Sequence, residues 1–217
     1  PAAAELEEKV LNWLIQMLGL PSGFEGVIQD TASTATLAAL LTAREKVTQL
    51  RINEKGFKSE DKFRVYCSGE THSSIEKAVK IAGLGKDNLV KIEVDESFRL
   101  RPDLLKESIE RDIKQGYKPL CIVATIGTTG TTSSDPLEEI ALISKEYKLW
   151  LHVDAALAGS ALLLPEYRWM IKGIEQVDSF VFNPHKWLFT NFDCSAYFVR
   201  NPEMLIRTFE ILPEYLK

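Results

Sequence analysis

Short apolar runs that resemble β-strands alternate with helix-like segments along most of this chain. Pro102 is placed to begin one such helix, which is predicted to end at Gly116. Strands that alternate with helices predict βαβ crossovers and a mostly parallel sheet. The runs are almost continuously apolar, which is typical of a sheet covered on both faces. The predicted strands are residues 63–67, 89–94, 120–126, 149–153, 179–182 and 195–199.

Local signals predict further elements around these strands. Apolar residues at helical spacing predict a helix near residues 6–17, and an Ala- and Leu-rich helix over 33–47. The polar stretch 51–62 is predicted to be an exposed loop. Ser73 and Glu76 form the pattern of a capping box, which predicts that a helix begins there.

Composition and charge exclude several classes of function. The 217 residues carry a net charge of −5 without a basic stripe, so no nucleic-acid partner is expected. No apolar run approaches the roughly 20 residues that span a bilayer, so no membrane association is expected. The widely spaced Cys67, Cys121 and Cys194 predict reduced thiols of a cytoplasmic protein. The three Cys and three His show no zinc-ligand spacing, and no metal site is predicted.

Polar residues follow the predicted strands, where parallel sheets bind their ligands. Asp154 comes directly after the run 149–153, and Lys186 comes shortly after 179–182. His72 follows the first of these strands, and a Gly- and Thr-rich loop, 127–135, follows the third. Because the carboxyl ends of parallel strands meet at one edge of a sheet, these side chains are expected to converge.

Two of these segments resemble motifs of one enzyme family. His152-Val-Asp-Ala-Ala-Leu-Ala-Gly-Ser160 and Asn183-Pro-His-Lys-Trp187 resemble those of the group II decarboxylases, which depend on pyridoxal phosphate and include aromatic-amino-acid, tyrosine and histidine decarboxylases. The resemblance covers almost the whole chain. It implies the α/β large domain of fold type I, with a seven-stranded, mostly parallel sheet flanked by helices. Residues 1–217 are expected to form this cofactor-binding domain without the family's N-terminal segment and C-terminal small domain.

The resemblance also implies roles at the cofactor ring. Lys186 is expected to carry the cofactor as a Schiff base, and Asp154 to keep the pyridine nitrogen protonated so that the ring can accept electrons. His72 is similar to the family's ring-stacking histidine and is expected to take part in catalysis. Ala156 corresponds to the residue on the other ring face, and Thr129 to the one beside the ring hydroxyl and substrate carboxylate.

A second group of residues is implied at the phosphate. Ala32 and Ser33 begin the predicted helix 33–47, and free N–H groups at a helix start favour an anion. Thr31 is expected to assist Ala32 and Ser33 in binding the phosphate. The resemblance implies that Asn183 shapes the phosphate end of the site, and that His185 contacts the phosphate or the substrate.

The reaction implied is decarboxylation of an L-amino acid, with an aromatic substrate favoured, in a homodimer. Tyr215 is similar to the family's tyrosine that is thought to protonate Cα, a position that is phenylalanine in the related aldehyde synthases. An aldehyde synthase, a glutamate-type decarboxylase and a non-catalytic domain fragment stay open as alternatives. Leu157 departs from the family pattern, which usually has tyrosine there. A nucleotide-binding α/β protein is excluded, because neither glycine-rich phosphate motif of that class is present.

Overall fold

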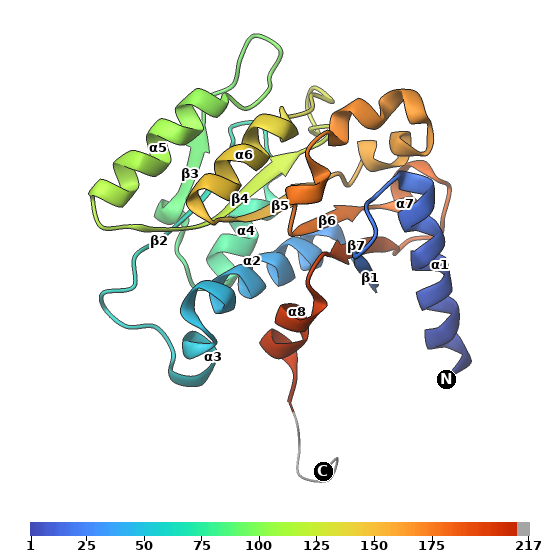
Figure 1. Ribbon diagram of the computed structural model, residues 1–217, viewed down its shortest axis with the longest axis horizontal. Helices are drawn as coiled ribbons and strands as arrows, with labels where there is room; N and C mark the ends of the chain where they lie inside the picture. Colours follow the sequence, from blue (N-terminus) through green and yellow to red (C-terminus); the bar gives the residue numbers. More distant parts are fainter. Residues whose placement is uncertain (212–217) are drawn as a thin grey trace.

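The computed structural model describes residues 1–211, which form one mixed sheet covered by helices on both faces (Figure 1). Its strands are β1 (Glu25–Gln29), β2 (Phe63–Ser68), β3 (Leu89–Ile92), β4 (Lys118–Thr125), β5 (Trp150–Asp154), β6 (Ser179–Phe182) and β7 (Ser195–Val199). The spatial order is β1-β7-β6-β5-β4-β2-β3. Strands β2 to β6 run parallel, β7 is antiparallel to β6, and β1 is antiparallel to β7. The predicted α/β class with a mostly parallel seven-stranded sheet is confirmed.

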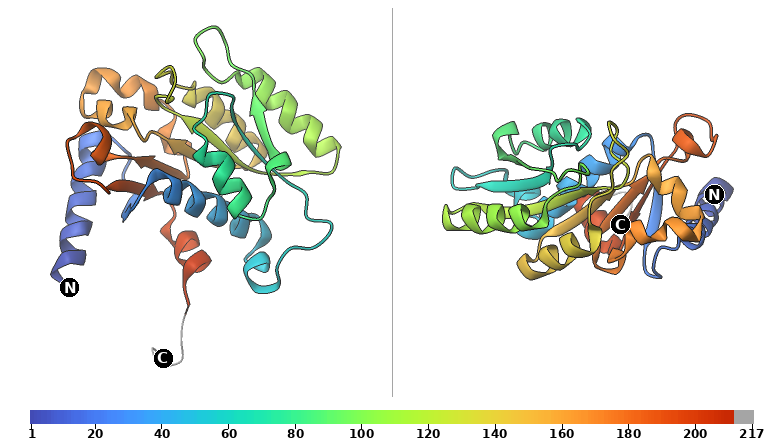
Figure 2. Two further views of the ribbon diagram at one scale, coloured as in Figure 1. Left: turned by 180° about the vertical axis from the view of Figure 1, so that it is seen from behind. Right: turned by 90° about the horizontal axis from the view of Figure 1, so that it is seen from above.

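The helices divide between the two faces of the sheet (Figures 1 and 2). One face carries α1 (Ala2–Leu18), α5 (Pro102–Lys114), α6 (Leu137–Tyr147) and the short 3-10 helices η2 (Ala158–Leu163), η3 (Pro165–Ile171) and η4 (Ile174–Gln176). The other face carries α2 (Ala32–Thr48), α3 (Arg51–Lys55), α4 (Ser74–Ile81) and α8 (Pro202–Phe209). The remaining helices are η1 (Lys86–Asn88) and α7 (Pro184–Trp187). Within residues 1–211, none of the helices combines the length and apolar character that a bilayer crossing requires.

Strand β5 shows how the sheet separates the two cores. Side chains alternate between the faces of a strand, so Leu151 and Val153 pack with α5 and α6. Trp150 packs on the opposite face, beneath α2, and His152 and Asp154 share that face by the same alternation. All five residues are buried. The burial of both faces explains why the central strands are apolar almost without interruption.

Strand β1 was missed by the sequence analysis. It is a short edge strand with Gly26 at its second position, and glycine disfavours strand formation. The pairing with β7 depends on that glycine, because a Cβ atom at Gly26 would lie 2.8 Å from the Phe198 ring. The strand is therefore set by a close approach to β7, which local sequence does not reveal.

Two other local predictions differ in part from the structure. The stretch 51–62 begins with helix α3, and Arg51 Nη2 donates to both carboxylate oxygens of Asp61 at 2.7 Å. A helix begins at the predicted capping box, because α4 starts at Ser74, but the Ser73 side chain does not cap it. The Glu76 carboxylate instead lies within 3.8 Å of the ammonium groups of Lys86 and Lys91, so the residue that could complete a capping box faces these lysines.

Candidate active site

A cavity of about 250 Å³ lies at the carboxyl ends of the parallel strands. Ten of the eleven residues predicted for the site line it, from five separate stretches of the chain. The eleventh, Tyr215, lies outside the described residues. The cavity is lined by Thr31, Ala32, Ser33, His72, Ser74, Thr125, Gly127, Thr129, Asp154, Ala156, Leu157, Asn183, His185, Lys186 and Phe192.

Asp154 is the buried carboxyl group of this cavity. It ends β5 and is only 4% exposed, and its Oδ1 accepts a hydrogen bond from the backbone N–H of Ala156 at 3.1 Å. Burial raises the pKa of Asp154, while the Ala156 N–H and the nearby side chains of Lys186 and His72 act to lower it. A buried carboxylate is costly unless a cation pairs with it, so this position suits a positively charged partner.

Lys186 reaches the same cavity from α7, the short helix that follows β6. Lys186 is exposed, and within residues 1–211 its ammonium group makes no ion pair within 4 Å. The loop around it is held by His185, whose Nδ1 accepts the backbone N–H of Cys194 at 2.8 Å and whose Nε2 lies 3.2 Å from Asn183 Nδ2. The Ser195 hydroxyl donates to Asn183 Oδ1 at 2.8 Å. His185 and Asn183 thus fix the backbone that presents the amine.

The N-terminus of α2 supplies backbone donors to the cavity. Thr31 Oγ1 accepts the N–H of Thr34, and Thr34 Oγ1 accepts the N–H of Thr31, which is a true capping box. Among residues 1–211, the N–H groups of Ala32 and Ser33 have no hydrogen-bond partner, as expected for the first turn of a helix. Two free N–H groups at a helix N-terminus form a favourable anion site.

His72 lies between β2 and α4, and its ring is fixed by the start of that helix. Its Nδ1 accepts the backbone N–H of Ser74 at 3.2 Å and lies 2.8 Å from the Ser74 hydroxyl. The imidazole therefore provides the cap that the sequence pattern assigned to Ser73. Its exposed ring borders the cavity.

Thr125, Gly127 and Phe192, to which the sequence analysis assigned no role, complete the wall. Thr125 ends β4 beside Asp154, and its buried hydroxyl has no hydrogen-bond partner among residues 1–211. Gly127 has φ +79°, and a Cβ atom there would lie 2.4 Å from that of Ala158, so a close backbone turn is required. The Phe192 ring packs against that of His185 at a tilt of 47°, with ring centroids 4.4 Å apart. Thr125 had a usable signal, as a hydroxyl residue at the end of an apolar run, and Gly127 lies in the loop 127–135 that was expected at the strand ends.

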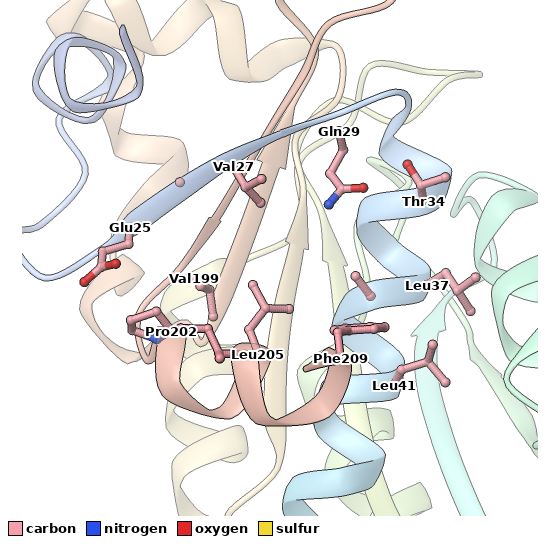
Figure 3. Close-up of a pocket in the computed structure, with 13 residues that line it drawn as sticks. Glu25, Val27, Gln29, Thr34, Leu37, Leu41, Val199, Pro202, Leu205 and Phe209 are labelled. Carbon is pink, nitrogen blue, oxygen red and sulfur yellow. The ribbon is translucent and has the colours of Figure 1, made fainter. Parts of the chain in front are cut away.

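A larger hollow of about 580 Å³ lies between β1, α2 and α8 (Figure 3). Figure 3 shows Leu37, Leu41, Leu205 and Phe209 around it. Among residues 1–211, Glu25 is the only ionisable residue in its lining. Within this described part of the chain, the hollow has no amine or imidazole beside its carboxylate, whereas the strand-end cavity brings all three groups together, so the strand-end cavity is the candidate active site.

A buried polar network lies one strand pleat below Asp154. His152 is fully buried, with Nδ1 2.9 Å from Ser179 Oγ and Nε2 3.3 Å from Thr36 Oγ1. The Trp150 indole N–H donates to the same Ser179 oxygen at 2.9 Å. Burial lowers the pKa of His152 to about 3, so the imidazole is neutral at neutral pH.

This burial of His152 predicts a loss of stability in acid. The unfolded state binds a proton near pH 6.5 and the folded state only near pH 3, so stability falls as the pH drops below 6.5. Between pH 7 and pH 5 the loss from this residue is about 2 kcal/mol. Denaturant unfolding at both pH values should show that, between pH 7 and pH 5, the wild-type protein loses about 2 kcal/mol more stability than His152→Gln.

The comparison with His152→Gln separates this effect from an opposing one. Burial raises the pKa of Asp135 to about 6, so Asp135 stabilises the folded state as the pH falls through 6. Both proteins contain Asp135, and its contribution cancels in their difference. Equal acid sensitivity of the two proteins would show that His152 does not carry the effect.

Comparison with known proteins identifies the family to which this fold and cavity belong. The family model described as the pyridoxal-dependent decarboxylase conserved domain matches residues 1–217. The chain belongs to this family. The cofactor expected from the sequence, pyridoxal phosphate, is thereby confirmed. The orphaned Thr125 hydroxyl, the free N–H groups of α2 and the buried Asp154 carboxyl fit this group, which carries a phosphate and a basic ring nitrogen.

Individual decarboxylases resemble the chain along its full length. It is 46% identical over 231 residues to histidine decarboxylase of Drosophila melanogaster and 45% identical over 225 residues to tyrosine decarboxylase 2 of Narcissus pseudonarcissus. Each match covers 100% of this chain, but 27% and 44% of those proteins. The solved structure of Oryza sativa TDC with PLP and tryptamine superposes with a TM-score of 0.94 at 38% identity, over 100% of this chain and 46% of that one. The chain therefore spans less than half the length of these relatives.

Proposed function

We propose that the protein to which this domain belongs is a pyridoxal-phosphate-dependent decarboxylase of aromatic L-amino acids. The observation that carries the proposal is the meeting of a buried carboxyl, Asp154, and an unpaired amine, Lys186, in one cavity. Membership of the decarboxylase family supports it. Two of the relatives are named as decarboxylases of histidine and of tyrosine, which supports an aromatic substrate.

When bound, the cofactor supplies an aldehyde carbon for covalent attachment and a ring that accepts electrons from Cα as CO₂ leaves. The domain's own residues prepare that chemistry. The amine of Lys186 is the nucleophile for the aldehyde carbon, and Asp154 holds a proton on the ring nitrogen. The N–H groups of Ala32 and Ser33 bind the phosphate. His72, which lines the cavity, would lie against one face of the ring.

The choice between amine and aldehyde products is part of the proposal. The phenylacetaldehyde synthase of a Rosa hybrid cultivar is 42% identical over 225 residues, so relatives of both reaction types resemble the chain. Tyr215, the residue on which the sequence analysis bases simple decarboxylation, lies outside the described residues. Identification of the reaction products is therefore needed to distinguish the decarboxylase reaction from the aldehyde synthase reaction.

A substrate panel on the full-length protein with added pyridoxal phosphate tests the proposal. We expect CO₂ release with formation of the amine from at least one of tyrosine, tryptophan, DOPA, phenylalanine or histidine, and little release from glutamate. Aldehyde together with hydrogen peroxide and ammonia would assign the synthase reaction instead. An absence of CO₂ from every amino acid, with the cofactor demonstrably bound, would overturn the proposal and favour a non-catalytic role.

We further propose that the protein is a homodimer with the cavity near the interface. Phe189 is 99% exposed, and Trp187 and Phe192 beside the cavity are also exposed. A neighbouring hollow of about 660 Å³ shares Leu157 and Lys186 with the cavity and is lined in part by Trp169 and Trp187. Exposed apolar surface of this kind marks interaction sites. A light-scattering mass equal to a single full-length chain would contradict the proposal.

A further inference from the structure

The His152 network connects two elements that contribute different parts of the candidate site. His152 lies two residues before Asp154 on β5, so both side chains project from the same face of the sheet, about 7 Å apart along the strand. Thr36 lies four residues after Ala32 on α2, so both lie on the same face of that helix. Thr36 and His152 are fully buried, and their Oγ1 and Nε2 atoms are 3.3 Å apart.

The imidazole is held at both ends. On the side away from α2, His152 Nδ1 meets Ser179 Oγ on β6, which also accepts the Trp150 indole N–H. The ring is therefore fixed by β5 and β6, and it meets α2 one turn from the free N–H groups of Ala32 and Ser33. The contact thus lies between the end of α2 and the strand that carries Asp154.

We propose that His152 is a positioning residue that holds the N-terminus of α2 at the distance from Asp154 that the bound cofactor requires. The phosphate-binding end and the ring-binding carboxylate belong to separate elements, and the His152–Thr36 contact joins them. This inference rests on the proposed cofactor contacts of Ala32, Ser33 and Asp154. It adds a function for a histidine that takes no part in the chemistry.

Two threonines of α2 provide a matched test in the full-length protein. Thr36 and Thr42 are both fully buried, but Thr42 Oγ1 donates to Ala38 O within its own helix. Thr36→Val and Thr42→Val remove the same hydroxyl from the same helix with little change in shape. Only Thr36→Val removes the contact to His152.

The readout is the ratio of the affinities for pyridoxal phosphate and for pyridoxal, which lacks the phosphate. Misplacement of α2 weakens only the phosphate contacts, so in Thr36→Val the ratio should fall about five-fold, the value of one lost hydrogen bond. In Thr42→Val the ratio should equal that of the wild type. A second pair of variants extends the test. In His152→Gln the side-chain amide reaches the position of the imidazole Nε2, so the affinity ratio should be preserved. In His152→Asn the shorter side chain reaches only the position of Nδ1, so the ratio should fall.

The outcomes separate the inference from the proposed function. If Thr36→Val and Thr42→Val give the same ratio, or if Thr36→Val weakens both ligands equally, the positioning role is overturned while the cofactor assignment stands. If the wild-type protein binds pyridoxal phosphate no better than pyridoxal, the proposed phosphate site itself fails, and the inference falls with it.

Discussion

Lys186→Ala is expected to abolish turnover in the full-length protein, with a loss of roughly 10⁴-fold or more, because it removes the nucleophile of covalent catalysis. Borohydride treatment of the wild-type protein with pyridoxal phosphate should leave a covalent adduct on the peptide that contains Lys186. The same treatment of the variant should leave none. Mass spectrometry of the digested protein measures this outcome directly.

Lys186→Arg separates the covalent role from an electrostatic one. Arginine keeps the positive charge near Asp154, but its guanidinium stays protonated and cannot attack an aldehyde. It should be as inactive as Lys186→Ala. Lys172→Ala is the control, since Lys172 is an exposed lysine paired with Glu138 at 2.9 Å. Activity retained in Lys186→Arg, or an adduct on another lysine, would refute the assignment.

The placement of the main site residues could be predicted from sequence because it follows from topology. Asp154 and Lys186 each come after an apolar strand, and parallel strands bring their carboxyl ends to one edge. His72 and Thr129 follow β2 and β4 in the same way. The position of each group therefore depends only on the order of strands and helices, which hydrophobic pattern reveals well.

The side-chain hydrogen bonds that support the site could not be predicted from the sequence, because several of them join segments that are far apart in the chain. The pattern at Ser73 and Glu76 is a good capping box, yet His72 caps α4 and the true box lies at Thr31. The contact of His152 with Thr36 joins residues 116 positions apart. His152 and His185 both lie within the two motifs that resemble the decarboxylase family. Local sequence alone does not show that His152 is buried in a polar network while His185 lines the cavity.

Asp154→Asn is expected to lower the turnover of the full-length protein by roughly 10³-fold and to weaken cofactor binding. The asparagine amide has nearly the same shape and can still accept the Ala156 N–H, but it carries no charge to hold a proton on the ring nitrogen. Loss of one partner of a buried ion pair costs about 3–5 kcal/mol, and a roughly 10³-fold loss of turnover corresponds to a free energy within that range. Steady-state kinetics at saturating pyridoxal phosphate separate the loss of turnover from the loss of affinity.

Asp112→Asn controls for the burial of a carboxylate as such. Asp112 is 3% exposed on α5, away from the cavity, and accepts the Tyr66 hydroxyl at 3.0 Å. Its replacement should lower the free energy of unfolding while leaving turnover per folded molecule near the wild-type value.

In Asp154→Asn the free energy of unfolding should be kept while turnover is lost. Burial raises the pKa of the Asp154 carboxyl because it disfavours the charged form, and the uncharged amide does not carry that cost. A variant that is folded, at least as stable as the wild type and nearly inactive would show that this carboxylate is retained for chemistry. Full activity in Asp154→Asn would instead mean that another group protonates the ring.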